Sequence, residues 1–281
     1  MARELRFDAL LPQEMATKAE YLGERKAEMP LLTMFTLAVL AGAFIGLGAM
    51  FATSTAAGSA GVLPYGVVRA LTGFVFCLGL VLVIVGGAEL FTGNNLIVMA
   101  WASGKVSTPS LLRNWTIVYI GNFIGSITAA VLVFSSRQYL FGSGSVGQTA
   151  LGIANSKVHL GFLQAIALGV LCNILVCLAI WLTFSARSTI DKIAAIIFPI
   201  TAFVAAGFEH SIANMYFIPM GLLIYKFDPS FAAAANIDLS GLTWGTFLLN
   251  NLLPVTIGNI IGGTVFVAAI YWSVFLRRKP V

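Results

Sequence analysis

The chain has 281 residues, of which 59% are hydrophobic and only 10% are charged. Soluble domains carry about 25% charged residues, so this composition excludes an ordinary soluble protein and indicates a polytopic α-helical membrane protein. The net charge of +5 comes from basic residues spread over the termini and short loops, which does not favour a nucleic-acid partner. Cys77, Cys172 and Cys177 fall within apolar stretches without metal-ligand spacing, so we expect packed free thiols.

The first 29 residues are polar and precede the first apolar stretch, so we expect no cleavable signal peptide at Met1. Pro12 is suited to open a short helix, which would carry Met15, Ala19 and Leu22 on one side. Two interpretations remain open at this point. The segment is either an amphipathic helix at the cytoplasmic interface or a solvated tail.

Six hydrophobic segments follow, at about 31–53, 65–102, 110–135, 159–185, 190–225 and 247–276. The second and fifth exceed the ~20 residues that a straight helix needs to span a bilayer. Residues 86–95 interrupt the second, and residues 207–215 interrupt the fifth. We therefore predict that both helices are broken, the fifth ending near Ala206 and restarting near Ser211. Irregular backbone survives at that depth where it is buried in protein or lines a wet cavity, which marks a binding or permeation site.

The basic residues predict the orientation of the chain. With the N-terminus inside, twelve lysines and arginines fall on the cytoplasmic side and four fall outside. Because short loops rich in Lys and Arg stay in the cytoplasm, both termini are expected there. The outer set is Arg69, Arg137, Lys157 and Lys226.

The sequence contains an internal repeat. Two motifs recur in the same order: Gly87-x-Glu89-x4-Asn94 with Gly207-x-Glu209-x4-Asn214, and Ile-Gly-Asn-Phe-Ile-Gly from 120 with Ile-Gly-Asn-Ile-Ile-Gly from 257. Each unit, about 30–135 and about 159–276, holds three spans, so the two must be inserted in opposite orientations. Inverted repeats with broken helices at matching positions predict a substrate site near the bilayer midplane. The Gly-x-x-x-Gly pairs in the second motif predict close helix contacts.

Glu89 and Glu209 stand at the two breaks. Half-helices that start after them would point N–H groups and positive dipole ends inward, a setting that favours an anion. Two fixed carboxylates would, however, repel an anionic substrate. We therefore favour a structural role, in which each carboxylate accepts N–H bonds and holds an irregular loop, over direct contact with a substrate.

His210 follows Glu209, whereas Leu90 stands at the matching position in the first repeat. The symmetry of the repeats does not require this histidine, which favours a functional residue over a buried structural one. Ionisable groups inside a membrane usually face a cavity or pathway. A histidine can pass a proton near physiological pH and donate a hydrogen bond to a small oxyanion.

These motifs resemble those of the formate/nitrite transporter family. Residues 87–93 resemble its first signature, residues 169–179 its second, and residues 207–215 the segment that carries its central histidine. The similarity extends over almost the whole chain, from Phe7 to Trp272, and is closest to the bacterial formate channels.

The resemblance implies an all-α membrane protein whose protomer has six transmembrane helices in an aquaporin-like 3+3 inverted repeat. It also implies a homopentamer with one pore in each protomer. It further implies that Phe76 and Phe203 form an outer constriction, with Leu80 beside it, and that Leu90, Thr92 and Val176 narrow the inner side. Polar contacts are implied for Asn173, Thr92 and His210. Lys157 is implied to attract anions at the outer side. Support for this path is expected from Glu89, Glu209, Asn94, Asn214 and Lys157.

The implied function is passive or proton-coupled, bidirectional and pH-dependent transport of formate across the bacterial inner membrane. The alternatives are transport of nitrite or another short monovalent anion, and an uncharged-solute facilitator, which the absent Asn-Pro-Ala motifs disfavour. No metalloprotease, nucleophile-elbow or P-loop motif is present, so neither an enzyme nor a cofactor is expected. The expected divisions are a cytoplasmic amphipathic segment (1–29), a transmembrane channel domain (30–276) in contact with lipid, and a cytoplasmic tail (277–281).

Overall fold

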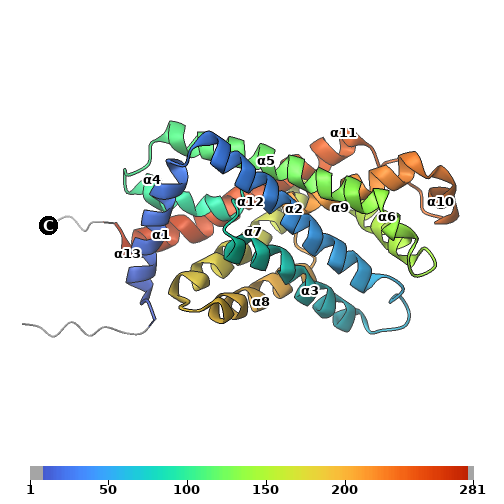
Figure 1. Cartoon of the computed structure of the whole chain (residues 1–281), viewed down its shortest axis with the longest axis horizontal. Helices are drawn as coiled ribbons and strands as arrows, with labels where there is room; N and C mark the ends of the chain where they lie inside the picture. The colour runs from blue at the N-terminus through green and yellow to red at the C-terminus, as the bar shows by residue number, and fades with distance from the viewer. Residues whose placement is uncertain (1–8, 278–281) are drawn as a thin grey trace, which may run out of the picture.

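The computed structural model describes residues 9–277 (Figure 1). The start of the expected N-terminal segment, with Phe7, and residues 278–281 of the expected tail lie outside the described residues. The regular elements within 9–277 are all helical, as expected for an α-helical membrane protein. Their bounds are α1 (Pro12–Ala27), α2 (Leu31–Ala56), α3 (Tyr65–Gly86), η1 (Gly93–Ile97), α4 (Val98–Ala102), α5 (Thr108–Ser135), η2 (Gln138–Leu140), α6 (Ser145–Val158), α7 (Phe162–Ser185), α8 (Thr189–Ala205), α9 (Ser211–Phe227), α10 (Pro229–Ala234), α11 (Trp244–Thr246), η3 (Phe247–Leu252), α12 (Leu253–Gly263), η4 (Thr264–Ala269) and α13 (Ile270–Phe275).

Five helical stretches among these residues are long and apolar enough to cross a membrane: α2, α3, α5, α7 and the continuous run Trp244–Phe275. Their sequences are apolar over many turns, so their outer faces expose large hydrophobic side chains such as Leu132 and Leu163. Exposed apolar surface of this extent suits lipid or another protomer better than water. The segment 190–225 forms two shorter helices, α8 and α9, of 17 residues each.

The irregular stretches after α3 and after α8 begin with the same two backbone features. Gly87 and Gly207 adopt left-handed φ angles of 76° and 77°, which glycine reaches without the steric cost of a Cβ atom. The next residue closes the helix end in both cases, because Ala88 and Phe208 donate their N–H groups to carbonyls at 2.9 Å and 3.0 Å. The elements that follow the two irregular stretches differ. The first continues as the short helices η1 and α4, and the second as the long helix α9.

Glycines bring two pairs of helices into close contact, α2 with α5 and α7 with α12. A Cβ atom on Gly125 would collide with the carbonyl of Val39 on α2, and one on Gly262 with the carbonyl of Val170 on α7. The close helix contacts that these Gly-x-x-x-Gly pairs predict are present. They bring the backbones of neighbouring spans together in the same way in both halves.

Residues 12–27 form the helix α1, which lies at the same end of the molecule as α4 and α13 (Figure 1). Its buried side includes Met15 and Ala19. Lys105, in the loop between α4 and α5, contacts the carboxylates of Glu20 at 2.6 Å and Glu24 at 3.1 Å. The helix is therefore attached to the bundle by apolar packing and by ion pairs.

Candidate functional site

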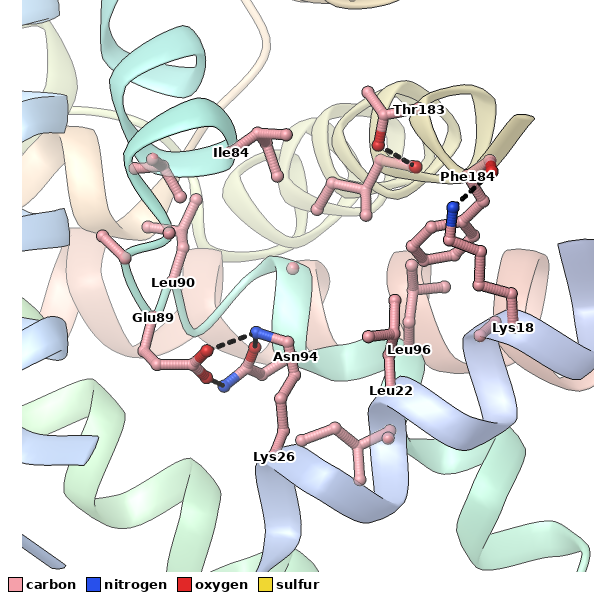
Figure 2. A pocket seen from close by; sticks show the side chains of 18 of the residues that line it. Lys18, Leu22, Lys26, Ile84, Glu89, Leu90, Asn94, Leu96, Thr183 and Phe184 are labelled. Carbon is pink, nitrogen blue, oxygen red and sulfur yellow. Dashed lines mark hydrogen bonds and ion pairs between the residues drawn. The ribbon is translucent and has the colours of Figure 1, made fainter. Parts of the chain in front are cut away.

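Glu89 lies in the first irregular stretch and is only 4% exposed. Its Oε1 accepts a hydrogen bond from Lys26 Nζ at 2.6 Å, and its Oε2 accepts one from Asn94 Nδ2 at 2.8 Å (Figure 2). Asn114 on α5 completes the cluster, because its Oδ1 accepts a bond from Asn94 at 2.9 Å and its Nδ2 donates to the Lys26 carbonyl at 3.0 Å. The carboxylate is paired with a cation and held by an amide, so it is an anchor for the loop.

Glu209, 5% exposed, sits in a second cluster of the same composition. Its Oε1 accepts from Lys157 Nζ at 2.7 Å, and its Oε2 accepts from Asn214 Nδ2 at 2.7 Å. Asn251 accepts from Asn214 at 2.7 Å and donates to the Lys157 carbonyl at 2.9 Å. The two lysines lie on α1 and α6, which are not among the long apolar helices. The correspondence between the two repeats therefore extends beyond the spans.

Two asparagines of the repeated Ile-Gly-Asn motif bind the backbone of the two irregular stretches. Asn122 donates to the carbonyls of Ala38 at 2.7 Å and Glu89 at 2.9 Å, and its Oδ1 accepts the N–H of Phe91 at 2.9 Å. Asn259 makes the same three bonds with Gly169, Glu209 and Ser211. Backbone groups of the two irregular stretches that lack helical partners are thus satisfied inside the protein.

His210 connects the two irregular stretches. It caps α9, where its Nδ1 accepts the N–H of Ala213 at 3.0 Å, and its Nε2 lies 3.0 Å from Thr92 Oγ1. Because Nδ1 acts as an acceptor, the neutral imidazole carries its proton on Nε2 and donates it to Thr92. The ring is 3% exposed.

Asn173 on α7 extends this line of polar groups. Its Nδ2 lies 2.7 Å from the Asn259 carbonyl, 3.2 Å from Asn95 Oδ1 and 3.3 Å from the Thr92 carbonyl. Its Oδ1 is buried and has no hydrogen-bond partner among residues 9–277. Unpaired buried acceptors are uncommon, so this spot offers an acceptor that another polar group could use.

Phe76 and Phe203 meet edge to face, with ring centroids 5.6 Å apart. Phe203 also stacks on His210 at 5.9 Å. Five predicted site residues therefore form one series of contacts: Phe76, Phe203, His210, Thr92 and Asn173. Leu80, Leu90 and Val176 are buried in the same core, and their positions along a path stay predictions.

Lys157 has a partner that the sequence did not predict, because it pairs with Glu209. Its side chain is 15% exposed, so much of the ammonium charge is offset by the neighbouring carboxylate. Its expected role as an attractor for anions stays a prediction.

A family model described as formate/nitrite transporter matches residues 13–273. The formate channel FocA of Escherichia coli (strain K12) is 44% identical over 277 residues, which cover 97% of each chain. A solved structure described as a pentameric formate channel with formate bound superposes with a TM-score of 0.82 at 47% identity, over 88% of this chain and 98% of that one. An ion channel of the FNT family superposes with a TM-score of 0.79 at 28% identity, over 93% and 98% of the two chains.

Proposed function

The chain belongs to the formate/nitrite transporter family, and we propose that it transports formate across the bacterial inner membrane. The family consists of transporters, in agreement with the prediction that the chain is not an enzyme. The observation that carries the proposal is the His210–Thr92 contact between the two breaks, in a chain whose relatives are formate channels. Nitrite and other short monovalent anions are the alternative substrates.

The proposed architecture is an aquaporin-like 3+3 inverted repeat, with the second and fifth spans broken after α3 and α8. The two Lys–Glu–Asn–Asn clusters support it, because unrelated halves would not repeat four residue types in the same contacts. The proposed assembly is a homopentamer, since a similar solved channel is pentameric. Both termini would lie in the cytoplasm, with residues 30–276 as the channel domain.

The proposed path runs past Phe76 and Phe203 to the His210–Thr92 pair. An anion that crosses an apolar constriction loses water, and a bare charge in such surroundings is strongly disfavoured. The Nε2–H group of His210 and the hydroxyl of Thr92 offer hydrogen bonds at this point. Asn173, Leu90 and Val176 would follow on the inner side, with Leu80 near the phenylalanines.

The geometry of His210 constrains a proton-coupled mechanism. An imidazolium carries hydrogens on both ring nitrogens, so protonation of Nδ1 would end its bond with the Ala213 N–H. His210 can therefore donate a hydrogen bond to the anion in the conformation described here, and can give up a proton only after the start of α9 rearranges. Proton-coupled transport through His210 therefore requires a rearrangement at the start of α9, whereas passive transport does not.

Uptake of labelled formate into liposomes that contain the purified protein tests the function. We expect uptake that exceeds protein-free liposomes and that excess unlabelled formate inhibits. Competition for this uptake by nitrite and acetate tests selectivity among small anions. Competition by glycerol tests for a path that admits uncharged solutes. Inhibition by glycerol alone, or flux equal to protein-free liposomes, would contradict the proposal.

Replacing both Phe76 and Phe203 by alanine should raise formate flux and admit larger carboxylates. The two rings contact each other and are buried, so their loss removes the bulk proposed to keep the path narrow. Flux of formate, acetate and lactate would be compared in the double variant and in Phe184→Ala, which removes a phenylalanine outside this contact. Unchanged selectivity in the double variant would count against the proposed constriction.

The ion pairs of α1 predict how the helix responds to pH. The hydrogen bonds that Lys105 donates to Glu20 and Glu24 raise the pKa of Lys105, so this lysine stays charged until the pH passes above its ordinary alkaline range. Deleting residues 1–28 should abolish pH-dependent closure, but it also removes Lys26 from Glu89.

Lys105→Gln is the cleaner variant, because it removes the ion pairs of Lys105 with Glu20 and Glu24 and leaves the Lys26–Glu89 pair in place. We expect its formate flux to vary less with pH than that of the wild type, whereas Arg25→Gln, an exposed change on the same helix, keeps the wild-type profile. Formate efflux between pH 5 and pH 8 measures both. Coincident profiles for wild type, Lys105→Gln and the truncated protein would reject gating by α1.

A further inference from the structure

An arginine joins the start of α3 to the end of α8, two helices that lie side by side (Figure 1). Arg69 on α3 donates hydrogen bonds from Nε to the Ala205 carbonyl at 3.1 Å and from Nη2 to the Val204 carbonyl. Carbonyls in the last turn of a helix have no partner within that helix, so the guanidinium caps the end of α8. Its Nη2 also lies 3.5 Å from the position that a Cβ atom on Gly207 would take. The arginine therefore reaches the left-handed glycine of the second irregular stretch.

Arg69 and Phe76 lie on the same face of α3, because they are seven residues apart, or about two helical turns. Each contacts the last turns of α8: Arg69 binds carbonyls, and the ring of Phe76 meets that of Phe203 with centroids 5.6 Å apart. Between them, a Cβ atom on Gly73 would lie 2.6 Å from the Thr201 carbonyl oxygen, so the two backbones meet closely at this level. Phe203 immediately precedes the carbonyls that Arg69 binds. The arginine thus attaches to α3 the helical turn that carries this ring.

The matching contact at the first irregular stretch, between the start of α8 and the end of α3, has neither part of this arrangement. The alignment of the two repeated Glu motifs places Thr189 opposite Arg69 and Val83 opposite Phe203. Threonine cannot span the distance that an arginine side chain spans, yet α3 ends in a left-handed glycine as α8 does. The fold therefore does not require an arginine to end a helix at an irregular stretch. The arginine is present at the end where the aromatic ring is.

We propose that Arg69 is a positioning residue for the outer constriction. It holds the last turn of α8 against α3 and so keeps Phe203 in contact with Phe76. Hydrogen bonds from a charged donor are about twice as strong as neutral ones, and the planar guanidinium binds two carbonyls in a fixed geometry. Without these bonds the end of α8 can move away at Gly207, which widens the path for anions larger than formate. The inference deepens the proposed function and rests on it for the place of the constriction.

The buried thiol of Cys77, the residue after Phe76, tests this attachment without transport. Its Sγ lies 3.6 Å from Thr201 Oγ1 on α8, so it becomes reactive when the two helices separate. Cys172, buried on α7, serves as an internal reference in the same protein. Arg69→Gln should accelerate labelling of Cys77 by N-ethylmaleimide about tenfold relative to Cys172, because loss of a charged hydrogen bond shifts a local opening equilibrium by about that factor. Mass spectrometry of the labelled peptides measures both rates.

The ratio of acetate flux to formate flux in liposomes tests the effect on the constriction. Both anions carry one charge, so loss of a cation affects them alike, whereas a wider constriction favours acetate. Arg69→Gln should raise the ratio, and Arg69→Lys, which keeps the charge without the planar fork, should raise it less. Arg137→Gln removes an exposed cation of the predicted outer set and should leave the ratio unchanged. In the Phe76→Ala, Phe203→Ala protein, Arg69→Gln should change the ratio no further, because no ring remains to be positioned.

Faster labelling of both cysteines in Arg69→Gln would mean that Arg69 holds the whole fold. An unchanged flux ratio beside faster labelling of Cys77 would mean that the attachment does not set the constriction. Either result overturns the proposal, as does a variant that matches the wild type in both measurements. If Arg69→Gln does not fold, Arg69→Lys carries both measurements. Formate uptake equal to that of protein-free liposomes, together with selective acceleration at Cys77, would refute the proposed function and leave the attachment of α8 to α3 in place.

Discussion

Lys157→Met is expected to destabilise the protein by about 3–5 kcal/mol, the cost of removing one partner of a buried ion pair. The variant leaves the Glu209 carboxylate buried without its counter-charge, bound only by Asn214 and Asn251. Methionine keeps most of the side-chain volume, so the change tests charge rather than packing. The thermal midpoint of the purified protein in detergent measures the loss.

The matching pair in the first repeat supplies the control. Lys26 is 31% exposed against 15% for Lys157, so solvent can reach Glu89 more easily when Lys26→Met removes the cation. The loss in stability should therefore be smaller there. Adding Glu209→Gln to Lys157→Met should restore much of the stability, because no unpaired charge remains. Equal losses in both repeats, without recovery in the double variant, would show that packing and not charge controls these clusters.

The irregular stretches after α3 and after α8 have a local cause in the sequence, whereas their interpretation as breaks in two spans stays a proposal. Gly87 and Gly207 provide the left-handed backbone, and a buried glutamate follows each of them. The partners of those glutamates come from distant elements. Lys26 lies on α1, a segment for which the sequence allows either an interfacial helix or a solvated tail. Neither interpretation predicts that the Lys26 ammonium pairs with Glu89.

The asparagines of the two clusters share a spacing in the sequence. Asn122 and Asn259 belong to the repeated Ile-Gly-Asn motif, and each has another asparagine eight positions before it, Asn114 and Asn251. This shared spacing is the sequence feature that predicts matching partners for the two glutamates. No comparable spacing predicts the contact between His210 and Thr92, because it joins the two halves and depends on how the irregular stretches approach each other.

His210→Asn should retain the fold and lose proton-coupled formate uptake at acidic pH. Asparagine is a favourable N-cap, so its side-chain oxygen can accept the Ala213 N–H that His210 accepts now. It cannot exchange a proton, and it is too short to keep the contact with Thr92. Uptake driven by a pH gradient is expected to fall about tenfold or more, since a hydrogen bond to a charged group contributes ~1.5–3 kcal/mol.

Thr92→Val distinguishes proton exchange by His210 from the hydrogen bond between His210 and Thr92. This variant leaves His210 able to exchange protons but removes the hydroxyl at 3.0 Å from Nε2. If His210 relays protons, Thr92→Val should lower total flux while uptake still follows the pH gradient, and His210→Asn should show passive flux that ignores the gradient. Formate uptake and proton entry, measured together in liposomes with an internal pH dye, distinguish the two. If proton entry in His210→Asn matched the wild type, the histidine would serve as the cap of α9, and the proton would reach the anion by another route.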